Sequence, residues 1–587
     1  MDKKEIAEIL GEMGTLLELQ GANPFKSRAF QNASRAMEGV TQDLQTLVTS
    51  GGLLEIKGIG KSIAAIVTDL VNSGKSAEYD ALRKQFPPGV IEMLRIQGLG
   101  PKKVKVLYEK LKISSLEKLE QAAKKGVLES LDGFGKKSQE NILKGIDALR
   151  SRSDKSLYPA AYEPAQQMYE HLLKQHGVLR AEVAGSLRRH KEVIGDIDIL
   201  VSAKDIHRSA LMKAFTEWQG VEAVVAKGET KSTVLLAKGI SCDLRIVSDQ
   251  EFPFALNYFT GSKEHNVEMR ARANKYGWSL NEYGFSKAGG EEKRGKAKQV
   301  VRCRTEGDIY KALDLAFIPP ELRENMGEIE AAELGTLPHL VEEKDIRGTF
   351  HCHTTYSDGL STLQQMVDAA RALGWEYLGV ADHSKAAAYA GGLTEEKLKS
   401  QIRDIDRMNE SLNGFRIFKG TECDILPNGD LDWTNKVLAT LDYVVISIHS
   451  NFTMKKAEMT KRIVKALKNT YVTMLGHPTG RLLLARDEYA VDMIQVIDAA
   501  SDYGKMIEIN AHPMRLDLDW RLCKYAKGKG VLIPINPDAH NVEGLHDVHY
   551  GVGIARKGWL EKSNIPNTMS TRDVEKIFAL IGRGQRK

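Results

Sequence analysis

Apolar side chains recur every three or four residues through the first 150 residues, which is the pattern of amphipathic helices. The clearest example runs from Ile6 to Leu17. One pattern also occurs three times here, with an apolar segment, a glycine–apolar–glycine turn, a lysine and another amphipathic segment, at 53–67, 93–107 and 128–143. The sequence therefore predicts a helical N-terminal region that contains a repeated helix–turn–helix unit.

From about residue 159 onward, helix patterns alternate with short strand patterns. Strands are expected at 195–202, 231–237 and 240–247, and a Lys238–Gly239 turn joins the last two. Further apolar strands are expected at 377–382, 443–449, 471–477, 506–512 and 531–540. These alternate with helices such as 361–373 and 457–467, and the rhythm is typical of a β/α layered or barrel domain.

Composition places the chain among ordinary globular proteins. Its 587 residues, 42% hydrophobic and 27% charged, are too many for one core, so about three to five domains are expected. No apolar run approaches the length of about 18 residues that a membrane span needs. Five scattered cysteines without a CxxC pattern argue against a disulfide framework or a cysteine–zinc site. Because no signal-peptide pattern opens the sequence, we expect a cytoplasmic protein.

Charge and breaker residues refine this picture. The net charge of +5 is too small to indicate a polyanion partner, so any nucleic-acid footprint must be local. The polar segment 151–159 and the Pro-Pro-containing, acidic segment 318–344 predict domain boundaries.

Each glycine–apolar–glycine turn would expose backbone N–H groups at the start of a helix, which suits a phosphate ligand. Glycine allows the close approach, and a lysine at or near the following position adds positive charge. One such turn is often only a connection between helices, whereas three copies resemble the helix-hairpin-helix elements that bind DNA backbone. The residues expected to contact DNA are Gly58, Gly60, Lys61, Gly98, Gly100, Lys102, Gly133, Gly135 and Lys136.

Three carboxylates on apolar strands indicate a divalent-cation site. Asp196 and Asp198 are two positions apart on one predicted strand, so both face the same way at a Cα spacing of about 7 Å. Asp243 lies on a second apolar strand. Such carboxylates are costly beside apolar residues unless a cation joins them. Together they could hold two Mg²⁺ ions about 4 Å apart, the arrangement that activates a hydroxyl and neutralises a leaving pyrophosphate.

At this point the sequence resembles the family X DNA polymerases. The motifs GSLRR (185–189), GDIDIL, GETKS (228–232), CDLR and YFTGSKEHN (258–266) follow the family's order. The resemblance implies that Asp196, Asp198 and Asp243 bind catalytic Mg²⁺ or Mn²⁺, with Asp243 helping to deprotonate the primer 3′-hydroxyl. It implies these nucleotide-binding residues: Gly185, Ser186 and Arg189 for the triphosphate, Tyr258, Phe259 and Gly261 for the sugar, and Asn266 and Arg270 for the base and template.

Two details of the resemblance bear on the reaction. Template-independent relatives tend to carry Gly-Trp where this sequence has Tyr258 and Phe259, so template-directed synthesis is expected. Some relatives form a Schiff base with abasic sugar through a lysine eight residues after the first hairpin glycine. That position is Ile66 here, which argues against a lyase of that type.

Nine histidine and acidic residues near strand ends predict a second metal site. Strand ends are where β/α folds place active sites, and imidazole and carboxylate ligands suit Zn²⁺ or Mn²⁺. A single histidine in such a position is more often structural, but nine donors are hard to explain by packing. The motifs that carry these donors are HCHTTYSDG (351–359), ADHS (381–384), GTECDI (420–425), SIHS (447–450), LGHP (475–478) and PDAH (537–540).

This C-terminal segment resembles the PHP (polymerase and histidinol phosphatase) domain, a distorted (β/α)7 barrel with a trinuclear metal site. The resemblance implies about three Mn²⁺ or Zn²⁺ ions. It also implies nine ligand positions, all of which are filled here: His351, His353, Asp358, His383, Glu422, His449, His477, Asp538 and His540. Cys352 and Cys423 adjoin ligands, yet neighbours on a strand face opposite ways, so both cysteines are expected to be packing residues.

Together these patterns predict a multidomain α+β and α/β fold. The expected order is a helical DNA-end-binding domain (1–85), a fingers-like helix-hairpin-helix segment (86–150), a nucleotidyltransferase palm (151–250), a thumb (251–318), a linker (319–345) and the PHP domain (346–587).

The expected function is template-directed filling of short gaps in DNA repair, with 3′–5′ exonuclease or phosphodiesterase activity in the PHP domain. The partners would be gapped or nicked DNA and dNTPs, with no membrane, and the chain would be a monomer. Two alternatives remain: a polymerase whose PHP domain is only a scaffold, and a DNA-end-binding factor without catalysis.

Overall fold

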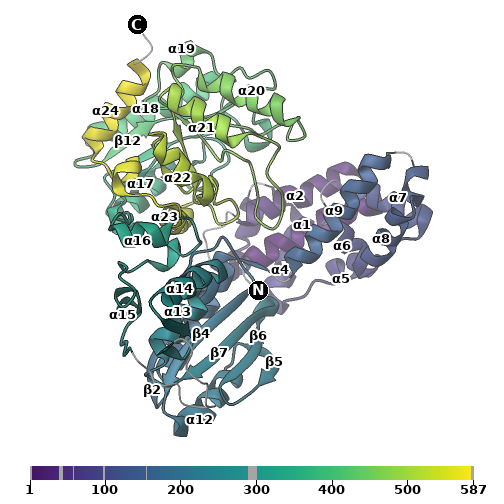
Figure 1. Ribbon diagram of the computed structural model, residues 1–587. Coiled ribbons are helices and arrows are strands. Elements are labelled where there is room, and N and C mark those ends of the chain that lie inside the picture. Colours follow the sequence, from purple (N-terminus) through teal and green to yellow (C-terminus); the bar gives the residue numbers. More distant parts are fainter. Residues whose placement is uncertain are drawn as a thin grey trace. The chain divides into compact units, whose positions relative to one another are not determined.

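The structure is a computed structural model that describes residues 3–38, 44–56, 58–94, 96, 99–131, 133–153, 155–287 and 301–583. The chain divides into two compact units, Met1–Ser153 and Asp154–Lys587 (Figure 1). The division falls within the polar segment 151–159 that the sequence marks as a boundary. Among the described residues, no helix combines the length and apolar character needed to cross a membrane.

The first unit is helical throughout its described residues. Its elements are α1 (Lys3–Gln20), α2 (Pro24–Glu38), α3 (Leu44–Ser50), η1 (Gly52–Glu55), α4 (Lys61–Ser73), α5 (Ala77–Arg83), α6 (Pro88–Met93), α7 (Pro101–Leu111), α8 (Leu116–Lys124), η2 (Val127–Ser130) and α9 (Lys136–Ser153). The apolar residues predicted to face inward on α1, such as Ile6 and Leu10, are fully buried. The helical prediction for this region is confirmed.

The three glycine–apolar–glycine turns lead directly into α4, α7 and α9. The apolar residue in the middle of each turn belongs to the core and is at most 5% exposed: Ile59, Leu99 and Phe134. A Cβ added at the second glycine would meet no atom within 4 Å, at Gly60, Gly100 or Gly135. Each turn is thus anchored by its apolar residue while the backbone at the start of the following helix stays accessible.

The second unit begins with a five-stranded sheet in the order β2–β4–β7–β6–β5 (Figure 1). Its strands are β2 (Val178–Val183), β4 (Asp196–Ala203), β5 (Val221–Lys227), β6 (Lys231–Leu236) and β7 (Ile240–Val247). β4 and β7 pair in parallel, and the other pairs are antiparallel. Helices α10 (Tyr158–Leu173) and α12 (Asp205–Thr216) pack against the sheet. Since β4 lies inside the sheet, between β2 and β7, every residue from Ile199 to its end is buried.

A second layer follows the sheet in the chain. It consists of α13 (Phe252–Thr260), α14 (Lys263–Lys275), the hairpin of β8 (Trp278–Asn281) and β9 (Gly284–Lys287), α15 (Glu306–Lys311), η4 (Pro320–Leu322) and α16 (Glu328–Leu334). The Ser262 hydroxyl accepts a hydrogen bond from the His265 backbone N–H at 3.2 Å and caps α14.

Most of the segment 319–345, expected as a linker, is folded as part of this layer. It contains η4, α16 and η5 (Glu343–Asp345), and it buries the Arg323 side chain completely. The guanidinium of Arg323 can be buried because the Glu306 carboxylate accepts a hydrogen bond from it at 2.6 Å.

The C-terminal part is built from short parallel strands and the helices between them. The strands are β10 (Gly348–Thr349), β11 (Tyr377–Val380), β12 (Arg416–Lys419), β13 (Glu422–Asp424), β14 (Val445–Ser447), β15 (Met474–Leu475), β16 (Met506–Ile507), β17 (Ile509–Asn510) and β18 (Ile535–Asn536). The helices are α17 (Leu363–Ala372), α18 (Glu395–Ser411), α19 (Asn435–Leu438), α20 (Lys456–Leu467), α21 (Met493–Asp502), α22 (Trp520–Gly528), α23 (Val548–Lys557) and α24 (Thr571–Arg583). The helices expected over 361–373 and 457–467 are confirmed as α17 and α20.

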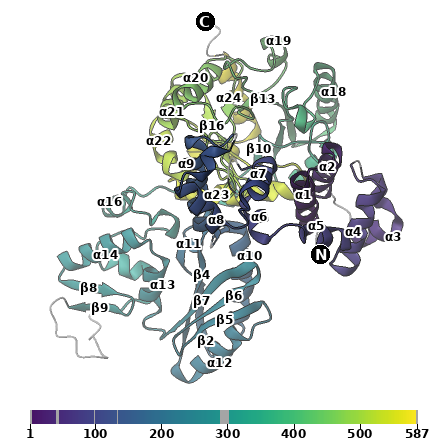
Figure 2. The same ribbon diagram turned by 90° about the vertical axis from the view of Figure 1, so that its right-hand side faces the viewer.

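Strand pairing in this part runs in a cycle. Parallel pairs join β10, β11 and β12, then β13 to β16, then β17 and β18. Single parallel bridges connect these groups further, between His383 and Glu422 and between Cys352 and Ala539. This pairing is consistent with the distorted barrel that the sequence predicts. Figure 2 shows the helices placed around the strands.

Helices α22 and α23 join the barrel to the sheet within the second unit. Trp520 at the start of α22 donates its indole N–H to the buried Glu192 carboxylate at 3.1 Å. In the same loop of the sheet domain, His190 stacks on Tyr158 at a ring distance of 5.1 Å and lies against Gly553 of α23. Burial, together with the nearby positive charges of α23, lowers the pKa of His190 to about 4, although Glu321 opposes this shift.

This half-buried histidine makes the stability of the second unit depend on pH. Since the unfolded chain binds a proton at His190 below about pH 6.5 and the folded chain does not, stability should fall as pH decreases from 6.5 toward 4. In His190→Asn, which suits the left-handed backbone at φ 51°, this fall should be shallower by up to about 1.4 kcal/mol per pH unit. Urea unfolding followed by tryptophan fluorescence measures it, because all six tryptophans lie in the second unit. Equal slopes in both proteins would contradict the assignment.

Candidate functional site

The three predicted carboxylates meet at the centre of the palm sheet. Asp198 of β4 lies directly opposite Asp243 of β7 in the parallel register, and Asp196 lies two residues earlier on the same strand. Asp196 is exposed, Asp198 is half-buried and Asp243 is buried. The structure thus places the three acids on two neighbouring inner strands, near the point where β4 begins.

Burial and mutual repulsion raise the pKa of two of these acids. Burial, followed by the charges of Asp196 and Asp243, raises the pKa of Asp198 to about 7. Burial and the Asp243 carboxylate also raise the pKa of Asp196. Such a group of acids is suited to a divalent cation, which would offset the repulsion.

Two neighbours of Asp243 were not singled out by the sequence. Lys231 of β6 places its ammonium 2.6 Å from Asp243, and the Thr233 hydroxyl donates to the same carboxylate at 2.5 Å. Both lie on the strand that pairs with β7, opposite Arg245 and Asp243. Lys231 belongs to the GETKS motif, which was the only sequence signal for it.

The Gly185–Ser186 turn lies directly against the carboxylates. Gly185 has a φ of 64°, and a Cβ there would lie 2.2 Å from the Asp198 carboxylate oxygen, so only glycine fits. The Ser186 hydroxyl is buried and has no hydrogen-bond partner among the described residues. A buried hydroxyl without a partner is available to a ligand such as a phosphate oxygen.

Arg189 is held by the thumb side of the site. Its Nε donates to the Glu324 carboxylate at 3.0 Å, and its Nη1 donates to the Thr260 carbonyl. Gly261 lies beside the same guanidinium, since an added Cβ would approach Arg189 to 3.0 Å. The structure therefore joins Arg189 to the Tyr258–Gly261 segment that the sequence assigns to the nucleotide sugar.

The remaining nucleotide-binding candidates lie on α13 and α14. The Tyr258 and Phe259 rings meet edge to face at 5.2 Å, and the Arg245 guanidinium covers Phe259 at 4.2 Å. The Asn266 side-chain amide donates to the Tyr258 carbonyl at 2.7 Å, and Arg270 Nε donates to the Asn266 carbonyl at 3.2 Å. These four candidates thus form one connected group.

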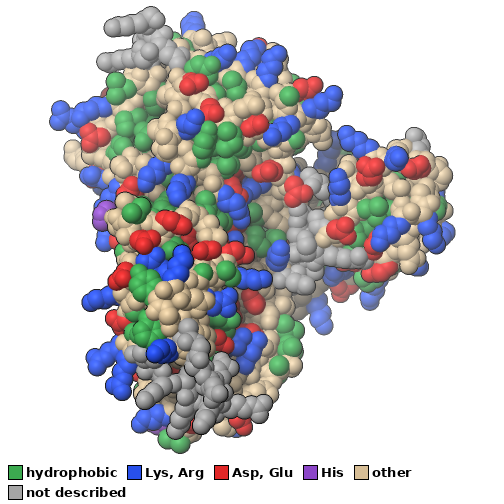
Figure 3. Space-filling model, viewed as in Figure 1, with side chains coloured by type: hydrophobic (Ala, Val, Ile, Leu, Met, Phe, Trp, Pro, Cys, Tyr) green, Lys and Arg blue, Asp and Glu red, His purple; other side chains and the backbone are tan. Residues whose placement is uncertain are grey.

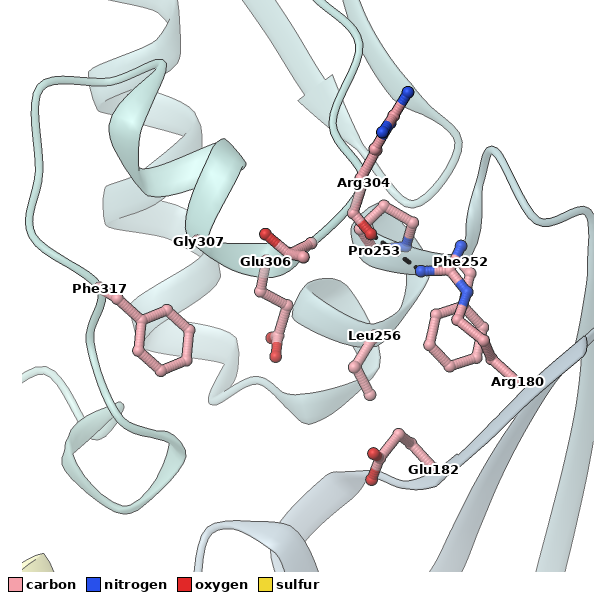
Figure 4. Close-up of a pocket in the computed structure, with 10 residues that line it drawn as sticks. Arg180, Glu182, Phe252, Pro253, Leu256, Arg304, Glu306, Gly307 and Phe317 are labelled. Atoms are coloured by element: carbon pink, nitrogen blue, oxygen red, sulfur yellow. Dashed lines mark hydrogen bonds between the residues drawn. The ribbon is translucent and has the colours of Figure 1, made fainter. Parts of the chain in front are cut away.

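A cavity of about 400 Å³ between β2 and the thumb contains none of these residues. Its walls include Arg180, Glu182, Phe252, Glu306 and Phe317. Figure 4 shows Glu182 and Glu306 directed toward the same space. The Glu306 carboxylate accepts hydrogen bonds from Arg188 and Arg323 and is already neutralised. The cavity is therefore separate from the polymerase-like site.

All nine predicted metal ligands converge in the barrel, and Glu422 lies at their centre. Its carboxylate is 2.8 Å from His383 Nδ1, 2.9 Å from His477 Nε2 and 3.3 Å from His449 Nε2. Glu422 is buried, with 1% of its surface exposed. Burial opposes its ionisation, yet the surrounding imidazoles hold the pKa of Glu422 well below its usual value.

The donors form three overlapping groups, each with its ligand atoms within 4.8 Å of one another. The first contains His353, Asp358, His383 and His540, the second His351, His353 and Asp538, and the third His383, Glu422 and His449. His353 and His383 each belong to two groups, as shared ligands of a multinuclear centre would. His477 is joined to the third group through Glu422.

Three ring nitrogens in the cluster have the environment that metal binding requires. His351 Nε2, His353 Nδ1 and His477 Nδ1 are buried and have no hydrogen-bond partner among the described residues. Burial would lower the pKa of His351, but the Glu508, Asp538 and Glu422 carboxylates raise it well above its usual value. Buried nitrogens without partners, surrounded by ionised carboxylates, fit Zn²⁺ or Mn²⁺ held by nitrogen and oxygen ligands.

A second ring of residues orients these ligands, and sequence reasoning missed it. The Glu508 carboxylate lies 2.9 Å from His351 Nδ1, and Asp424 lies 3.2 Å from His449 Nδ1. Such carboxylate–histidine pairs fix the ring orientation and the tautomer. The Asn510 amide likewise donates to Asp538 at 3.0 Å. The signal for Glu508 was a lone acid in the apolar strand MIEIN.

The cysteines beside the ligands are not ligands. The Cys352 thiol donates to the Gly379 carbonyl at 3.2 Å, and Cys423 is buried in the barrel core. Neither belongs to a group of described residues that could hold a metal. The prediction that both are packing residues is confirmed.

In the first unit, the hairpin residues are placed as turns and helix starts, with Lys61, Lys102 and Lys136 exposed. Gly98 lies outside the described residues. Ile66, at the position of the lyase lysine in some relatives, is buried in α4.

Comparisons with known proteins connect these sites to a family. Residues 1–76 match the helix-hairpin-helix domain, 90–148 a SAM-like helix-hairpin-helix tandem, 255–324 the DNA polymerase beta thumb and 349–512 the PHP domain. The chain is also 37% identical to "DNA polymerase/3'-5' exonuclease PolX" of Bacillus subtilis (strain 168), over 98% of this chain and 99% of that protein. It belongs to the bacterial family X DNA polymerases that carry a PHP domain.

More distant relatives of this family X polymerase match its parts separately. A "Probable phosphatase" of Acetivibrio thermocellus is 32% identical over 32% of this chain and 78% of that protein. "DNA polymerase lambda" of Rattus norvegicus is 27% identical over 46% of this chain and 48% of that protein. The resemblance to both families stated from the motifs is thereby confirmed.

The overlapping donor groups predict the metal content of this polymerase. The purified full chain should hold about three transition-metal ions, measured by inductively coupled plasma mass spectrometry after dialysis. His353→Ala removes a donor from two groups and should lose at least one ion, whereas His339→Ala, an exposed histidine outside them, should lose none. One ion or fewer per wild-type chain would contradict a multinuclear site.

Proposed function

We propose that this chain extends DNA 3′ ends with dNTPs at the palm and hydrolyses phosphodiester bonds at 3′ ends in the PHP domain. The observation that carries the proposal is the pairing of Asp198 with Asp243 in register, in the same compact unit as the convergent histidine cluster. The Bacillus subtilis relative that matches nearly the whole chain is named for both activities.

At the palm, Asp196, Asp198 and Asp243 would hold Mg²⁺ or Mn²⁺. Bound ions would lower the pKa of the attacking hydroxyl and neutralise the leaving pyrophosphate. Asp243 assists deprotonation of the primer 3′-hydroxyl, and Lys231 and Thr233 orient its carboxylate.

The incoming nucleotide is held by the residues around this carboxylate group. Gly185 lets the triphosphate approach, Ser186 offers its unpartnered hydroxyl and Arg189 adds charge. Tyr258, Phe259 and Gly261 contact the sugar. Asn266 and Arg270 face the base and the template.

In the PHP domain, the nine ligands would hold about three Mn²⁺ or Zn²⁺ ions, which supply an activated water for hydrolysis. Glu508 and Asp424 keep the His351 and His449 rings oriented toward the centre. Arg515 lies 3.5 Å from Asp538 and adds positive charge for a substrate phosphate. The complete donor set favours an active centre over a scaffold.

DNA is the substrate of both sites, and the helix-hairpin-helix turns of the first unit would bind its backbone. Figure 3 shows lysine and arginine interspersed with acidic residues over one face, so the binding surface must be local. Gapped or nicked DNA is the substrate expected of a repair enzyme. The enzyme would act as a monomer in the cytoplasm. Gap filling is the expected use of template-directed synthesis.

Removing the hairpin lysines should weaken DNA binding without regard to sequence. In Lys61→Ala/Lys102→Ala/Lys136→Ala, the slope of log affinity against log salt should decrease by about 0.9 for each phosphate that the protein no longer neutralises. Fluorescence anisotropy of a labelled gapped duplex at several salt concentrations measures it. Lys75→Ala/Lys84→Ala/Lys125→Ala changes three other exposed lysines that follow no hairpin glycine, so its slope should stay that of the wild type.

The two activities should separate by mutation. Asp198→Ala should reduce gap filling by a factor of about 100 or more, on the order expected for removal of a cation ligand, and leave 3′-end hydrolysis intact. His353→Ala should do the reverse, because its imidazole contacts only the barrel cluster. Primer extension and 3′ degradation on one gapped duplex measure both. Hydrolysis that survives His353→Ala would place the exonuclease elsewhere, and unchanged repair of gaps by Asp198→Ala would favour a non-catalytic end-binding factor.

A further inference from the structure

A buried lysine from the PHP domain reaches the nucleotide-binding loop of the palm. Lys557, the last residue of α23, has a side chain with 0% exposure. Its ammonium donates to the Arg189 carbonyl at 3.0 Å, to the Glu324 carboxylate at 2.5 Å and to the Glu321 carbonyl at 3.5 Å. In both ribbon views α23 lies between the barrel and the palm sheet (Figures 1 and 2).

Glu324 transmits this contact to the side chain of Arg189. One oxygen of Glu324 accepts from both Lys557 Nζ, at 2.5 Å, and Arg189 Nε, at 3.0 Å. Arg189 and Glu324 are only 11% and 8% exposed. Lys557 therefore holds Arg189 twice, at its carbonyl directly and at its guanidinium through Glu324.

Positive side chains outnumber negative ones at the contact between Lys557 and Glu324. Lys557, Arg189 and Lys191 face the single Glu324 carboxylate, with Lys191 at 3.6 Å. Burial opposes ionisation of Glu324, but Lys557 and then Arg189 lower its pKa below the usual value. Positive side chains therefore outnumber negative ones around Glu324, which favours an anion beside Arg189.

We propose that Lys557 is a positioning residue for nucleotide addition, supplied to the polymerase site by the PHP domain. The inference rests on the proposed function, in which Arg189 binds the triphosphate. Lys557 does not touch the nucleotide. It fixes the backbone and the guanidinium of Arg189 in the orientation that the triphosphate needs, and small displacements of such a group are costly to the rate.

Other charged pairs in the same interface do not reach Arg189, which provides a control. Arg556, the preceding residue on α23, donates to the Glu321 carboxylate at 2.7 Å and to the Val341 carbonyl at 2.9 Å. It also joins the PHP domain to the segment after the thumb. Arg556→Met removes a cation from the interface and leaves the Lys557–Glu324–Arg189 chain in place.

The test is steady-state gap filling by the full chain with varied dNTP concentration. Lys557→Met should raise the dNTP KM about tenfold, while Arg556→Met and the 3′-end hydrolysis of both variants should match the wild type. A dNTP KM unchanged in Lys557→Met would overturn the proposal, as would an equal rise in Arg556→Met. If the wild type itself adds no nucleotides, the proposed function fails first.

A double-mutant comparison separates positioning from general destabilisation. In an Arg189→Ala background, Lys557→Met should cause no further rise in KM, because the group it positions is absent. An independent, additive rise would overturn the proposal. If Lys557→Met does not fold, as judged by thermal unfolding and 3′-end hydrolysis, Lys557→Gln keeps a donor of similar reach. It should give a smaller rise in KM, again absent in the Arg189→Ala background, and an unchanged KM would again overturn the proposal.

Discussion

Buried charge must be neutralised, and much of the second unit is arranged around that requirement. Glu422 is buried at the centre of the histidine cluster, and its ionisation depends on the imidazoles of His449, His383 and His351. The imidazoles in turn depend on outer carboxylates such as Glu508. A cluster of this kind is stable only if every segment brings its donor to the same point, so the packing of the strands and the chemistry of the site depend on each other.

The same requirement shapes the palm. Asp198 has a raised pKa because it is buried and because Asp196 and Asp243 lie beside it, and Lys231 offsets only part of that charge. A divalent cation would relieve the remainder. Gly185 completes the arrangement, because any side chain there would occupy the space of the Asp198 carboxylate. Asp198 thus lies opposite Asp243, and the charges of Asp196 and Asp243 disfavour its ionisation unless a cation is present.

Between palm and barrel, the interface is built from ion pairs and aromatic rings. Trp520 binds Glu192, and Lys557 lies 4.5 Å from the Trp520 ring. Buried charges of this kind add little net stability over apolar contacts, but they permit few alternative packings. An interface that fixes Arg189 must allow only one packing arrangement, and this matters more than the stability that the interface adds. This gives a physical reason for the two domains to be joined through polar contacts.

Local patterns in the sequence were sufficient for much of this protein. Period-two spacing placed Asp196 and Asp198 on one face, helical spacing defined the first unit, and the order of motifs identified the family. The nine candidate ligands of the C-terminal part could be named because they occur in short motifs that match the PHP domain. The residues that orient them, such as Glu508 and Asp424, carried weaker signals, since one acid in an apolar strand can serve many purposes.

Tertiary structure alone decided which of these residues meet. The register of β4 against β7 sets Asp198 opposite Asp243, and a one-residue slip would turn Asp243 to the other face. Three overlapping donor groups join residues that are far apart in the chain, such as His351 and Asp538. Lys557 is 368 residues from Arg189, and no pattern of spacing links them. Sequence determines a side chain's local direction through backbone periodicity, but a contact between distant segments exists only once packing has brought their elements together.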